Sequence, residues 1–358
     1  MSAFSPLLDL PPFPPDANGQ LADRVKRVLS TRNDVVFVQA EAILALEAAA
    51  TSLSHPGRVA LNVVTSQYGG YFGGWLRRAG ADVVTVAAQA GLPVTVAAVE
   101  AALEARPDIG LVAMVHAETS SGILNPLPEI AAIVRSHGAL FLVDAVASVG
   151  GHQLDVDAMG IDVCVIGAQK ALAGPSGLSM VSVSPRAWEA MRPLPASSNL
   201  SLFDLKTNWL DRGRGAVPGM PSALEFWALD AALDRVEAET LQLCIERHRA
   251  ASSRTRAGLR ALGATLWIEQ DALASTLATA VRIPAGLDGA ALVDTARSGG
   301  ASLSAGIGAM ADHIVRIEHT GQRATPTAVL QNLTAYAVAL RRLGGSADLD
   351  AMERALRT

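Results

Sequence analysis

Short apolar runs alternate with longer segments of helical spacing through the first half of the chain. Runs rich in β-branched and other apolar residues predict strands at 35–38, 59–65, 82–86, 111–116, 139–143, 162–166 and 178–183. Between them, helical spacing predicts helices at 41–53, 71–79, 94–103 and 127–136. This alternation predicts an α/β fold, with a mostly parallel sheet covered by helices on both faces. Ligands of such sheets bind beyond the carboxyl ends of the strands.

The pattern changes after about residue 185. Residues 196–219 are irregular and polar, and residues 223–262 form one long helical stretch. The remainder predicts strands at 277–283, 302–303 and 313–318, and helices at 287–297, 326–342 and 349–356. We therefore expect a short N-terminal segment, a large domain, a linking segment with the long helix and a smaller C-terminal α+β domain, at 1–34, 35–195, 196–262 and 263–358.

The 358-residue chain is 50% hydrophobic and 18% charged, which is typical of a well-packed globular protein. Its net charge of -5 offers no basic surplus for binding nucleic acid or an anionic membrane. No uncharged apolar run is long enough to span a bilayer. Cys164 and Cys244 lie far apart in apolar stretches, so no disulfide framework is indicated and a cytoplasmic location is expected.

Candidate catalytic groups follow three of the predicted strands. Asp144 follows one apolar run and Lys170 follows another, while His116, Glu118 and Thr119 follow a third. The carboxyl ends of parallel strands meet at one edge of a sheet, so these groups are expected near a single ligand site. Taken alone, Asp144 could equally cap a helix or a turn, and Lys170 could be an exposed loop lysine.

Lysine is scarce in this chain, which makes a lysine near a strand end informative. Only Lys26, Lys170 and Lys206 occur, and arginine supplies the other positive side chains. A lysine amine can form a Schiff base with an aldehyde, which arginine cannot. A carboxylate such as Asp144 beside the nitrogen of a pyridoxal ring keeps that nitrogen protonated, so that the ring acts as an electron sink. No metal site is expected.

Three motifs in this region resemble the signature of the class V aminotransferases, which have fold type I. They lie at 143–151, 167–170 and 175–178, with serine at position 176 where the family has a second proline. The resemblance extends from roughly residue 16 to residue 342. It implies that the large domain binds pyridoxal, with Lys170 forming the Schiff base and Asp144 holding the pyridine nitrogen.

Further positions match the family one at a time. The resemblance implies that Tyr68 stacks on the pyridine ring, Thr119 binds near the ring hydroxyl and Arg316 binds the substrate carboxylate. Gln169 and Ser148 complete the expected cofactor-binding set. A guanidinium suits a carboxylate because it can donate two parallel hydrogen bonds. From the residues alone, Tyr68 could be a core aromatic, Thr119 a turn hydroxyl and Arg316 a surface arginine.

Glu41 departs from the family at the start of the first large helix. Phosphate-binding members have a small-residue turn there, whose amides and helix dipole hold the cofactor phosphate. A carboxylate in that place already satisfies the amides, and a second anion ~4 Å away would cost about 4 kcal/mol. Met220-Pro221 likewise replaces the threonine–proline pair that the neighbouring subunit usually contributes. Acidic residues are common in first helical turns, so Glu41 could also be only a first-turn acid.

These departures resemble the pyridoxamine–pyruvate aminotransferases, which use free pyridoxamine and pyridoxal as substrates. The resemblance implies amino transfer from pyridoxamine to a pyruvate-like 2-oxo acid, in a homodimer or homotetramer without nucleic-acid or membrane partners. The alternative is an ordinary pyridoxal 5′-phosphate enzyme of the alanine–glyoxylate or serine–pyruvate type. Ile307 stands where the pyridoxamine enzymes have a second arginine, and the usual N-terminal glycine–proline loop is not found, so the oxo-acid acceptor is left open.

Two further hypotheses compete with these. A cysteine desulfurase or lyase on the same fold needs a mobile-loop cysteine near the last strand, whereas Cys164 lies in a predicted strand and Cys244 in a predicted helix. The other hypothesis is a scaffold without turnover. The joint presence of Lys170, Asp144 and Tyr68 argues against it.

Overall fold

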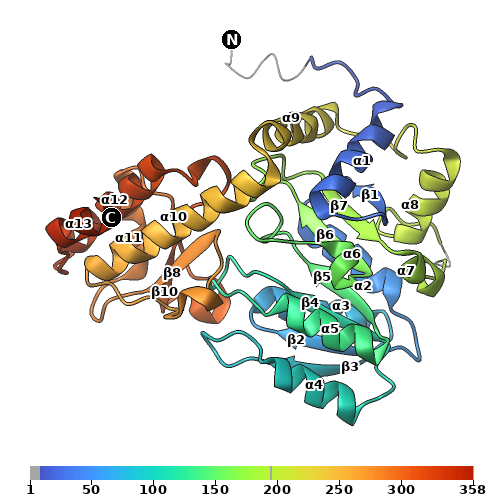
Figure 1. Ribbon diagram of the computed structural model, residues 1–358, viewed down its shortest axis with the longest axis horizontal. Coiled ribbons are helices and arrows are strands. Elements are labelled where there is room, and N and C mark those ends of the chain that lie inside the picture. Colours follow the sequence, from blue (N-terminus) through green and yellow to red (C-terminus); the bar gives the residue numbers. More distant parts are fainter. Residues whose placement is uncertain (1–8, 194–195, 358) are drawn as a thin grey trace.

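Two lobes of unequal size make up the protein in the computed structural model, which describes residues 9–193 and 196–357 (Figure 1). The larger lobe contains a seven-stranded sheet in the order β1-β7-β6-β5-β4-β2-β3. Its strands are β1 (Asp34–Val38), β2 (Val59–Val64), β3 (Asp82–Ala87), β4 (Leu111–Val115), β5 (Leu140–Asp144), β6 (Val163–Gly167) and β7 (Ser179–Val183). β7 pairs antiparallel with β1 and β6, and the other pairs are parallel. The predicted mostly parallel sheet is therefore confirmed.

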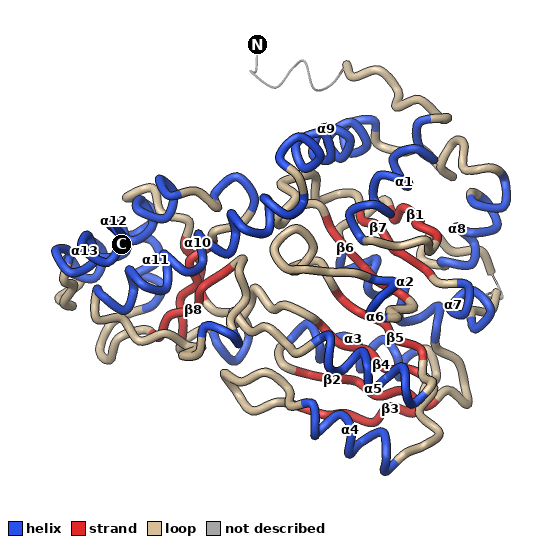
Figure 2. Tube along the Cα trace, in the orientation of Figure 1, coloured by secondary structure: helices blue, strands red, loops and turns tan. Residues whose placement is uncertain are grey.

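Helices lie on both faces of this sheet (Figure 2). They are α1 (Ala17–Leu29), α2 (Ala42–Leu53), α3 (Gln67–Arg78), α4 (Val96–Ala105), α5 (Leu127–His137), α6 (Val156–Met159), α7 (Pro185–Ala190), α8 (Leu202–Asn208), the 3-10 turn η2 (Leu210–Arg212) and α9 (Ala223–Glu239). Every residue of β4, β5, β6 and β7 is buried, which explains why β4, β5 and β6 are nearly continuous apolar runs rather than alternating ones. Ligands of such a covered sheet bind at its carboxyl edge.

The smaller lobe contains a three-stranded antiparallel sheet in the order β8-β10-β9. Its strands are β8 (Ala278–Arg282), β9 (Leu303–Ala305) and β10 (Ile314–Glu318), and its helices are α10 (Leu241–Ala261), α11 (Gly289–Ser298), α12 (Pro326–Arg342) and α13 (Leu349–Arg357), with 3-10 turns η3 (Asp271–Leu273), η4 (Gly308–Met310) and η5 (Gly321–Arg323). A separate hydrophobic core lies between this sheet and its helices. The predicted α+β character of this region is confirmed.

Helix α3 begins at Gln67, four residues before the predicted helix at 71–79. Its sequence contains four glycines, which lower helix propensity and hide the periodicity. Packing explains two of them: a Cβ on Gly69 would lie 3.0 Å from the Val63 carbonyl oxygen, and one on Gly73 would lie 2.7 Å from the Asn62 Nδ2. The glycines therefore allow α3 to approach β2 closely, at the cost of a clear helical signal.

Two other expectations about helices are wrong. The predicted irregular stretch 196–219 contains α8, and the predicted continuous helix 223–262 is divided between α9 and α10 at Thr240. Thr240 has a φ of 73°, which no residue within a right-handed helix adopts, and its hydroxyl then caps α10 by accepting from the Leu243 amide. Helix α1, which the sequence did not predict, occupies part of the N-terminal segment and packs against β1.

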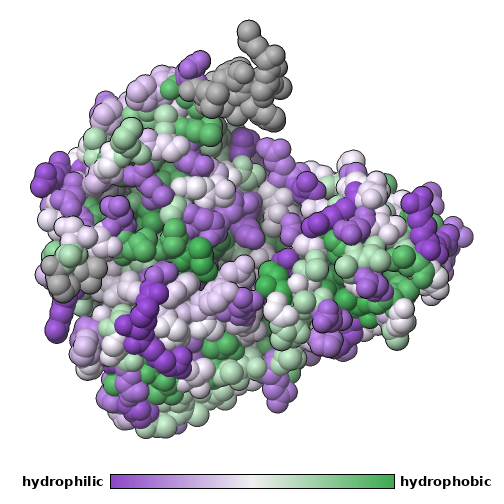
Figure 3. Space-filling view, turned by 180° about the vertical axis from the view of Figure 1, so that it is seen from behind, coloured by the Kyte–Doolittle hydropathy of each residue, from purple (hydrophilic) through white to green (hydrophobic). Residues whose placement is uncertain are grey.

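The surface is a mixture of polar and apolar residues, and apolar residues gather near the middle of the back face of the larger lobe (Figure 3). Among the described residues, Met220 is the most exposed large hydrophobic side chain, with 97% of its surface accessible. Within the same residues, no helix combines the length and apolar character needed to cross a bilayer.

Candidate active site

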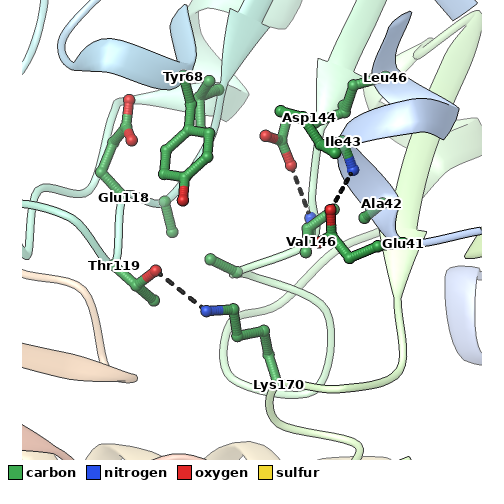
Figure 4. A pocket seen from close by; sticks show the side chains of 13 residues that line it. Glu41, Ala42, Ile43, Leu46, Tyr68, Glu118, Thr119, Asp144, Val146 and Lys170 are labelled. Carbon is green, nitrogen blue, oxygen red and sulfur yellow. Dashed lines mark hydrogen bonds between the residues drawn. The ribbon is translucent and has the colours of Figure 1, made fainter. Parts of the chain in front are cut away.

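A cavity lies where the carboxyl ends of β4 and β5 meet the first turns of α2 and α3 (Figure 4). Its lining residues are Glu41, Ala42, Ile43, Leu46, Tyr68, Val115, Ala117, Glu118, Thr119, Asp144, Val146, Ala147 and Lys170. Five residues of the expected cofactor-binding set are therefore brought together here, although they are spread over the first half of the chain. The cavity lies at the sheet edge where ligands of parallel sheets bind.

Asp144 is the last residue of β5 and is 5% exposed. Its Oδ1 accepts a hydrogen bond from the Val146 amide at 2.9 Å. Burial is the main cause that raises the pKa of this carboxyl to about 7, against the lowering effects of the Val146 amide and of Lys170. A buried carboxyl of this kind gains from a cationic N–H donor, since such a partner restores its charged form.

Lys170 lies three residues beyond β6, in a turn that brings its side chain into the cavity. Its Nζ donates to the Thr119 Oγ1 at a long 3.4 Å (Figure 4). The amine is only partly buried and is held by one weak hydrogen bond. It is therefore available to react with a ligand in the cavity.

Tyr68 projects from the first turn of α3 into the cavity, on the side opposite Lys170 in Figure 4. Ser66 caps this helix, with its Oγ accepting from the Tyr68 amide at 3.2 Å. Burial raises the pKa of the Tyr68 hydroxyl, which therefore stays neutral at physiological pH. A neutral aromatic ring at the wall of a cavity can stack on a planar ligand.

Glu41 is the N-cap residue of α2. One of its oxygens accepts from the Ile43 amide at 2.9 Å, and the other accepts from the Gln169 Nε2 at 3.1 Å. The carboxylate therefore already binds the helix amide that an anionic ligand would otherwise use. Because α1 comes earlier, α2 is the second long helix of the chain rather than the first.

Arg316 lies in β10 of the smaller lobe and reaches across to the larger one. Its Nη1 donates to the Thr119 carbonyl oxygen and its Nε to the Ala305 carbonyl oxygen, both at 3.0 Å. Partial burial lowers the pKa of the guanidinium, which nevertheless stays charged, and the nearby Glu318 opposes the effect of burial. Ile307 follows β9 and precedes η4, on the same lobe.

Ser148 and His116 do not line this cavity. The Ser148 side chain is fully buried in the turn after β5, where its Oγ donates to the Ala145 carbonyl oxygen at 3.2 Å. The His116 ring packs against His152 with ring centroids 5.6 Å apart, and burial lowers its pKa to about 4. Both cysteines are also buried, one in β6 and one in α10.

Glu118 lines the cavity, although the sequence named it only as a candidate group after a strand and gave it no specific role. It is 1% exposed, and burial raises the pKa of its carboxyl. Three hydroxyls donate to it: Thr65 at 3.0 Å, Ser120 at 3.3 Å and Ser66 through a very short hydrogen bond. The available sequence signal was its place after an apolar strand, directly before Thr119.

This convergence of a lysine, a buried carboxylate and an aromatic residue agrees with the comparison with known proteins. The family model for class-V aminotransferases matches residues 17–320. The chain belongs to the class-V aminotransferase family. It is therefore an aminotransferase of fold type I, a family that uses pyridoxal-phosphate chemistry.

Individual members of the class-V aminotransferase family match over most of their length. Pyridoxamine–pyruvate transaminase of Mesorhizobium japonicum is 36% identical over 329 residues, covering 91% of this chain and 83% of that protein. The crystal structure of pyridoxamine–pyruvate aminotransferase from Mesorhizobium loti superposes with a TM-score of 0.90 at 35% identity, covering 94% of this chain and 87% of that one. Alanine–glyoxylate aminotransferase of Drosophila melanogaster is 27% identical, covering 92% and 86%.

Proposed function

We propose that this aminotransferase transfers the amino group of unphosphorylated pyridoxamine to a pyruvate-like 2-oxo acid, giving pyridoxal and an amino acid. The observation that carries the proposal is the Glu41 carboxylate, which already accepts the Ile43 amide at the start of α2. A phosphate brought to that helix terminus would meet this anion, and two unit charges ~4 Å apart repel by about 4 kcal/mol at an effective dielectric of about 20. A neutral hydroxymethyl group could instead donate a hydrogen bond to Glu41.

The charges around the cavity support a cationic ligand. Glu41, Glu118 and Asp144 line it, and Lys170 is the one cationic residue among the described residues that line it. Pyridoxamine has an amine and a ring nitrogen that can both be protonated, whereas a phosphate would add a dianion to three carboxyls. The excess of carboxyls thus favours the unphosphorylated compound.

The residues of the cavity fit a pyridoxal ring. Such a ring, when bound, supplies the reactive carbon and an electron sink. We propose Lys170 as the amine that bonds covalently to the ring aldehyde, and Asp144 as the carboxylate that keeps the ring nitrogen protonated. The Tyr68 ring would cover one face of the pyridoxal ring, and Thr119 and Gln169 would hydrogen bond to groups at the edge of that ring. Ser148, buried in its own turn, would act only through the backbone it supports.

Proton transfer is the part of the reaction that the chain itself would perform. The Lys170 Nζ hydrogen bonds weakly to the Thr119 hydroxyl, so it can turn toward the reacting carbon and accept or donate a proton as a general base or acid. Arg316 does not line the cavity, but its guanidinium donates to the carbonyl oxygen of Thr119, which does, so we propose that it donates to the carboxylate of the oxo or amino acid.

A homodimer in the cytoplasm is the setting we propose for this activity. The support is the place of the exposed Met220, which with Pro221 stands where the family resemblance expects a contribution to the neighbouring subunit. The two buried, free cysteines are compatible with a reducing compartment. Gel filtration with light scattering tests the dimer, and a monomer at micromolar concentration would reject it.

The competing candidate is an ordinary pyridoxal 5′-phosphate enzyme of the alanine–glyoxylate type, which the Drosophila relative represents. Comparing dissociation constants for pyridoxal and its phosphate distinguishes the two. Wild type should bind pyridoxal more tightly than its phosphate. Glu41→Ser should shift the ratio of the two dissociation constants toward the phosphate by at least about tenfold. The shift is expected to be smaller than a repulsion of about 4 kcal/mol would give, because Glu41 is exposed and solvent screens its charge. Serine can keep the helix N-cap, so the substitution removes the charge and the hydrogen bond from Gln169 while the start of α2 is retained.

Glu129 offers a matched control, because it is an exposed acid in the first turn of another helix, α5, and does not line the cavity. Glu129→Ser should leave the ratio of the two dissociation constants unchanged. If wild type prefers the phosphate and Glu41→Ser does not shift the ratio, Glu41 is only a first-turn acid and the ordinary phosphate enzyme is the better assignment.

A further inference from the structure

Glu118 is a buried carboxyl group that is stabilised by hydroxyls rather than by a cation. Burying a carboxylate costs several kcal/mol unless hydrogen bonds replace its hydration. Three hydroxyls, from Thr65, Ser66 and Ser120, donate to its two oxygens. The backbone around it is also fixed, since its amide donates to the Ile123 carbonyl oxygen at 2.8 Å and its carbonyl accepts from the Gly122 amide at 2.7 Å. Both the side chain and the backbone of Glu118 are therefore held in place by hydrogen bonds, which indicates that its position matters.

Two of the hydroxyls act as relays: each accepts a hydrogen bond from one group and donates its own proton to Glu118. The Ser66 Oγ accepts from the Tyr68 amide and donates to Glu118. The Thr65 Oγ1 accepts from the Asn125 Nδ2 at 3.0 Å and donates to Glu118. A hydroxyl has a single proton, so each relay must end in an acceptor. A carboxylate fits because it accepts at both oxygens, whereas an amide would place a donor against one of the relays.

The relays join two walls of the cavity. Thr65 and Ser66 connect β2 to α3, whose first turn carries Tyr68. On the other side, Glu118 is bonded in the chain to Thr119, which accepts from Lys170 and Arg316. Figure 4 shows the Glu118 side chain beside the Tyr68 ring, and Thr119 with its hydrogen bond to Lys170 across the cavity from Tyr68.

We propose that Glu118 is a positioning residue that fixes the Tyr68 ring relative to Thr119 and Lys170, through the hydroxyls of Ser66 and Thr65. It acts through these neighbours and not on the reacting atoms. The inference rests on the proposed function in one respect, because the benefit of a fixed Tyr68 is tight stacking on a pyridoxal ring.

The first test needs no ligand and measures amide hydrogen exchange in the free protein by mass spectrometry. Glu118→Gln should speed exchange of the Tyr68 amide at least about tenfold, because the side-chain amide places a donor against one of the two hydroxyls and so loosens the junction of β2 and α3 that holds the Ser66 cap. Peptides from α4 should exchange as in wild type. Glu104→Gln, an exposed glutamate in α4, is the matched control and should leave the Tyr68 amide unchanged. Unchanged exchange at Tyr68 in Glu118→Gln would overturn the proposal.

The second test is a double-mutant cycle read out by pyridoxal binding. Glu118→Gln should weaken binding about tenfold when Tyr68 is present and less than about twofold in a Tyr68→Leu background, because the two residues act as a unit. Independent effects of the two substitutions would overturn the proposal. A structural role alone would lower thermal stability without this coupling.

Ser66→Ala interrupts the same relay from its other end and should reproduce both results if Glu118→Gln does not fold. The two tests also separate this inference from the proposed function. If wild type binds no pyridoxal compound, the proposed function fails, while the exchange measurement still decides whether Glu118 positions Tyr68.

Discussion

Two carboxylates in the cavity, Asp144 and Glu41, stand in opposite environments. Asp144 ends a central strand and is 5% exposed, and burial raises its pKa to about 7. Glu41 is exposed at a helix terminus, where a backbone amide and the Gln169 side chain already donate to it. The first carboxyl gains from a cationic partner that the ligand would bring. The second has its hydrogen-bond donors before any ligand arrives.

Under the proposed function, Asp144 takes part in catalysis, whereas Glu41 determines which ligand binds. A buried group with a perturbed pKa is typical of catalytic positions, since its charge state depends on the ligand. An exposed group that is already paired changes little when a ligand binds, so it acts mainly by repelling unsuitable ligands. We therefore expect substitutions at the buried end to reduce turnover and substitutions of Glu41 to alter the choice of ligand.

The largest effect is expected for Lys170→Ala, which removes the amine common to every step. Activity should fall at least about 10³-fold, in line with losing a general base and covalent partner. The protein should keep its fold, because the Lys170 side chain makes one long hydrogen bond. Borohydride reduction with pyridoxal followed by peptide mass spectrometry should label residue 170 in wild type alone. Substantial activity in the variant would remove the lysine from the mechanism.

Asp144→Asn should come next, with turnover about 10²-fold lower and ring binding largely kept. The amide has the shape of the carboxyl but stabilises a protonated ring nitrogen poorly. Steady-state rates and ligand titration would measure the two effects separately. Wild-type turnover in this variant would mean that another group partners the ring nitrogen.

Arg316→Leu should raise the KM for the amino or oxo acid about 10- to 100-fold, because a charge-assisted hydrogen bond contributes about 1.5–3 kcal/mol. Affinity for pyridoxal should change little. Steady-state kinetics would give the KM for the amino or oxo acid, and a binding titration would give the affinity for pyridoxal. An equal loss of both would indicate that Arg316 only joins the lobes through Thr119 and Ala305.

The sequence predicted the sheet and its carboxyl-edge residues well because both depend on local pattern. Fully buried strands appear as apolar runs; Asp144 ends one such run, and Lys170 lies three residues beyond another. Arg316 was expected from resemblance rather than pattern, and it reaches the site only because β10 packs near the Thr119 carbonyl oxygen. The contact joins residues 197 positions apart in sequence, a separation that no local periodicity encodes.

Three features of the structure could not be predicted from the sequence, and each has a physical reason. The early start of α3 was hidden by glycines that close packing against β2 requires, and the break at Thr240 depends on a single backbone angle. Glu118 has an ordinary sequence context, and its importance arises from hydroxyls contributed by Thr65, Ser66 and Ser120. Such networks become visible only when the strand ends are brought together.

A smaller effect concerns the pH dependence of the ligand-free protein. The folded-state pKa of Asp144, about 7, lies above its unfolded value, so the folded state binds more protons between these values. The contribution of this group to stability is therefore present at low pH and is lost as pH rises through about 7. Relative to Asp144→Asn, the Tm of wild type should fall across this range.

The exposed Asp312 provides the control for this measurement, since Asp312→Asn should show the pH profile of wild type. A constant Tm difference between wild type and Asp144→Asn from pH 4 to 8 would contradict the buried, raised-pKa description of Asp144. This scan runs from near the ordinary pKa of an aspartate, 3.8, to roughly one unit above the raised pKa of about 7.

The smallest expected effect separates the two roles of Glu41. As the N-cap of α2 it accepts the Ile43 amide, and loss of an N-cap costs about 1 kcal/mol. Glu41→Ala should therefore lower the free energy of unfolding by about that amount, whereas Glu41→Ser should retain most of it because serine is a good cap. Both variants should show the same shift in preference from pyridoxal toward its phosphate, since both remove the charge. If the preference instead follows the stability, so that only Glu41→Ala shifts it, the capping geometry and not the carboxylate charge selects the ligand.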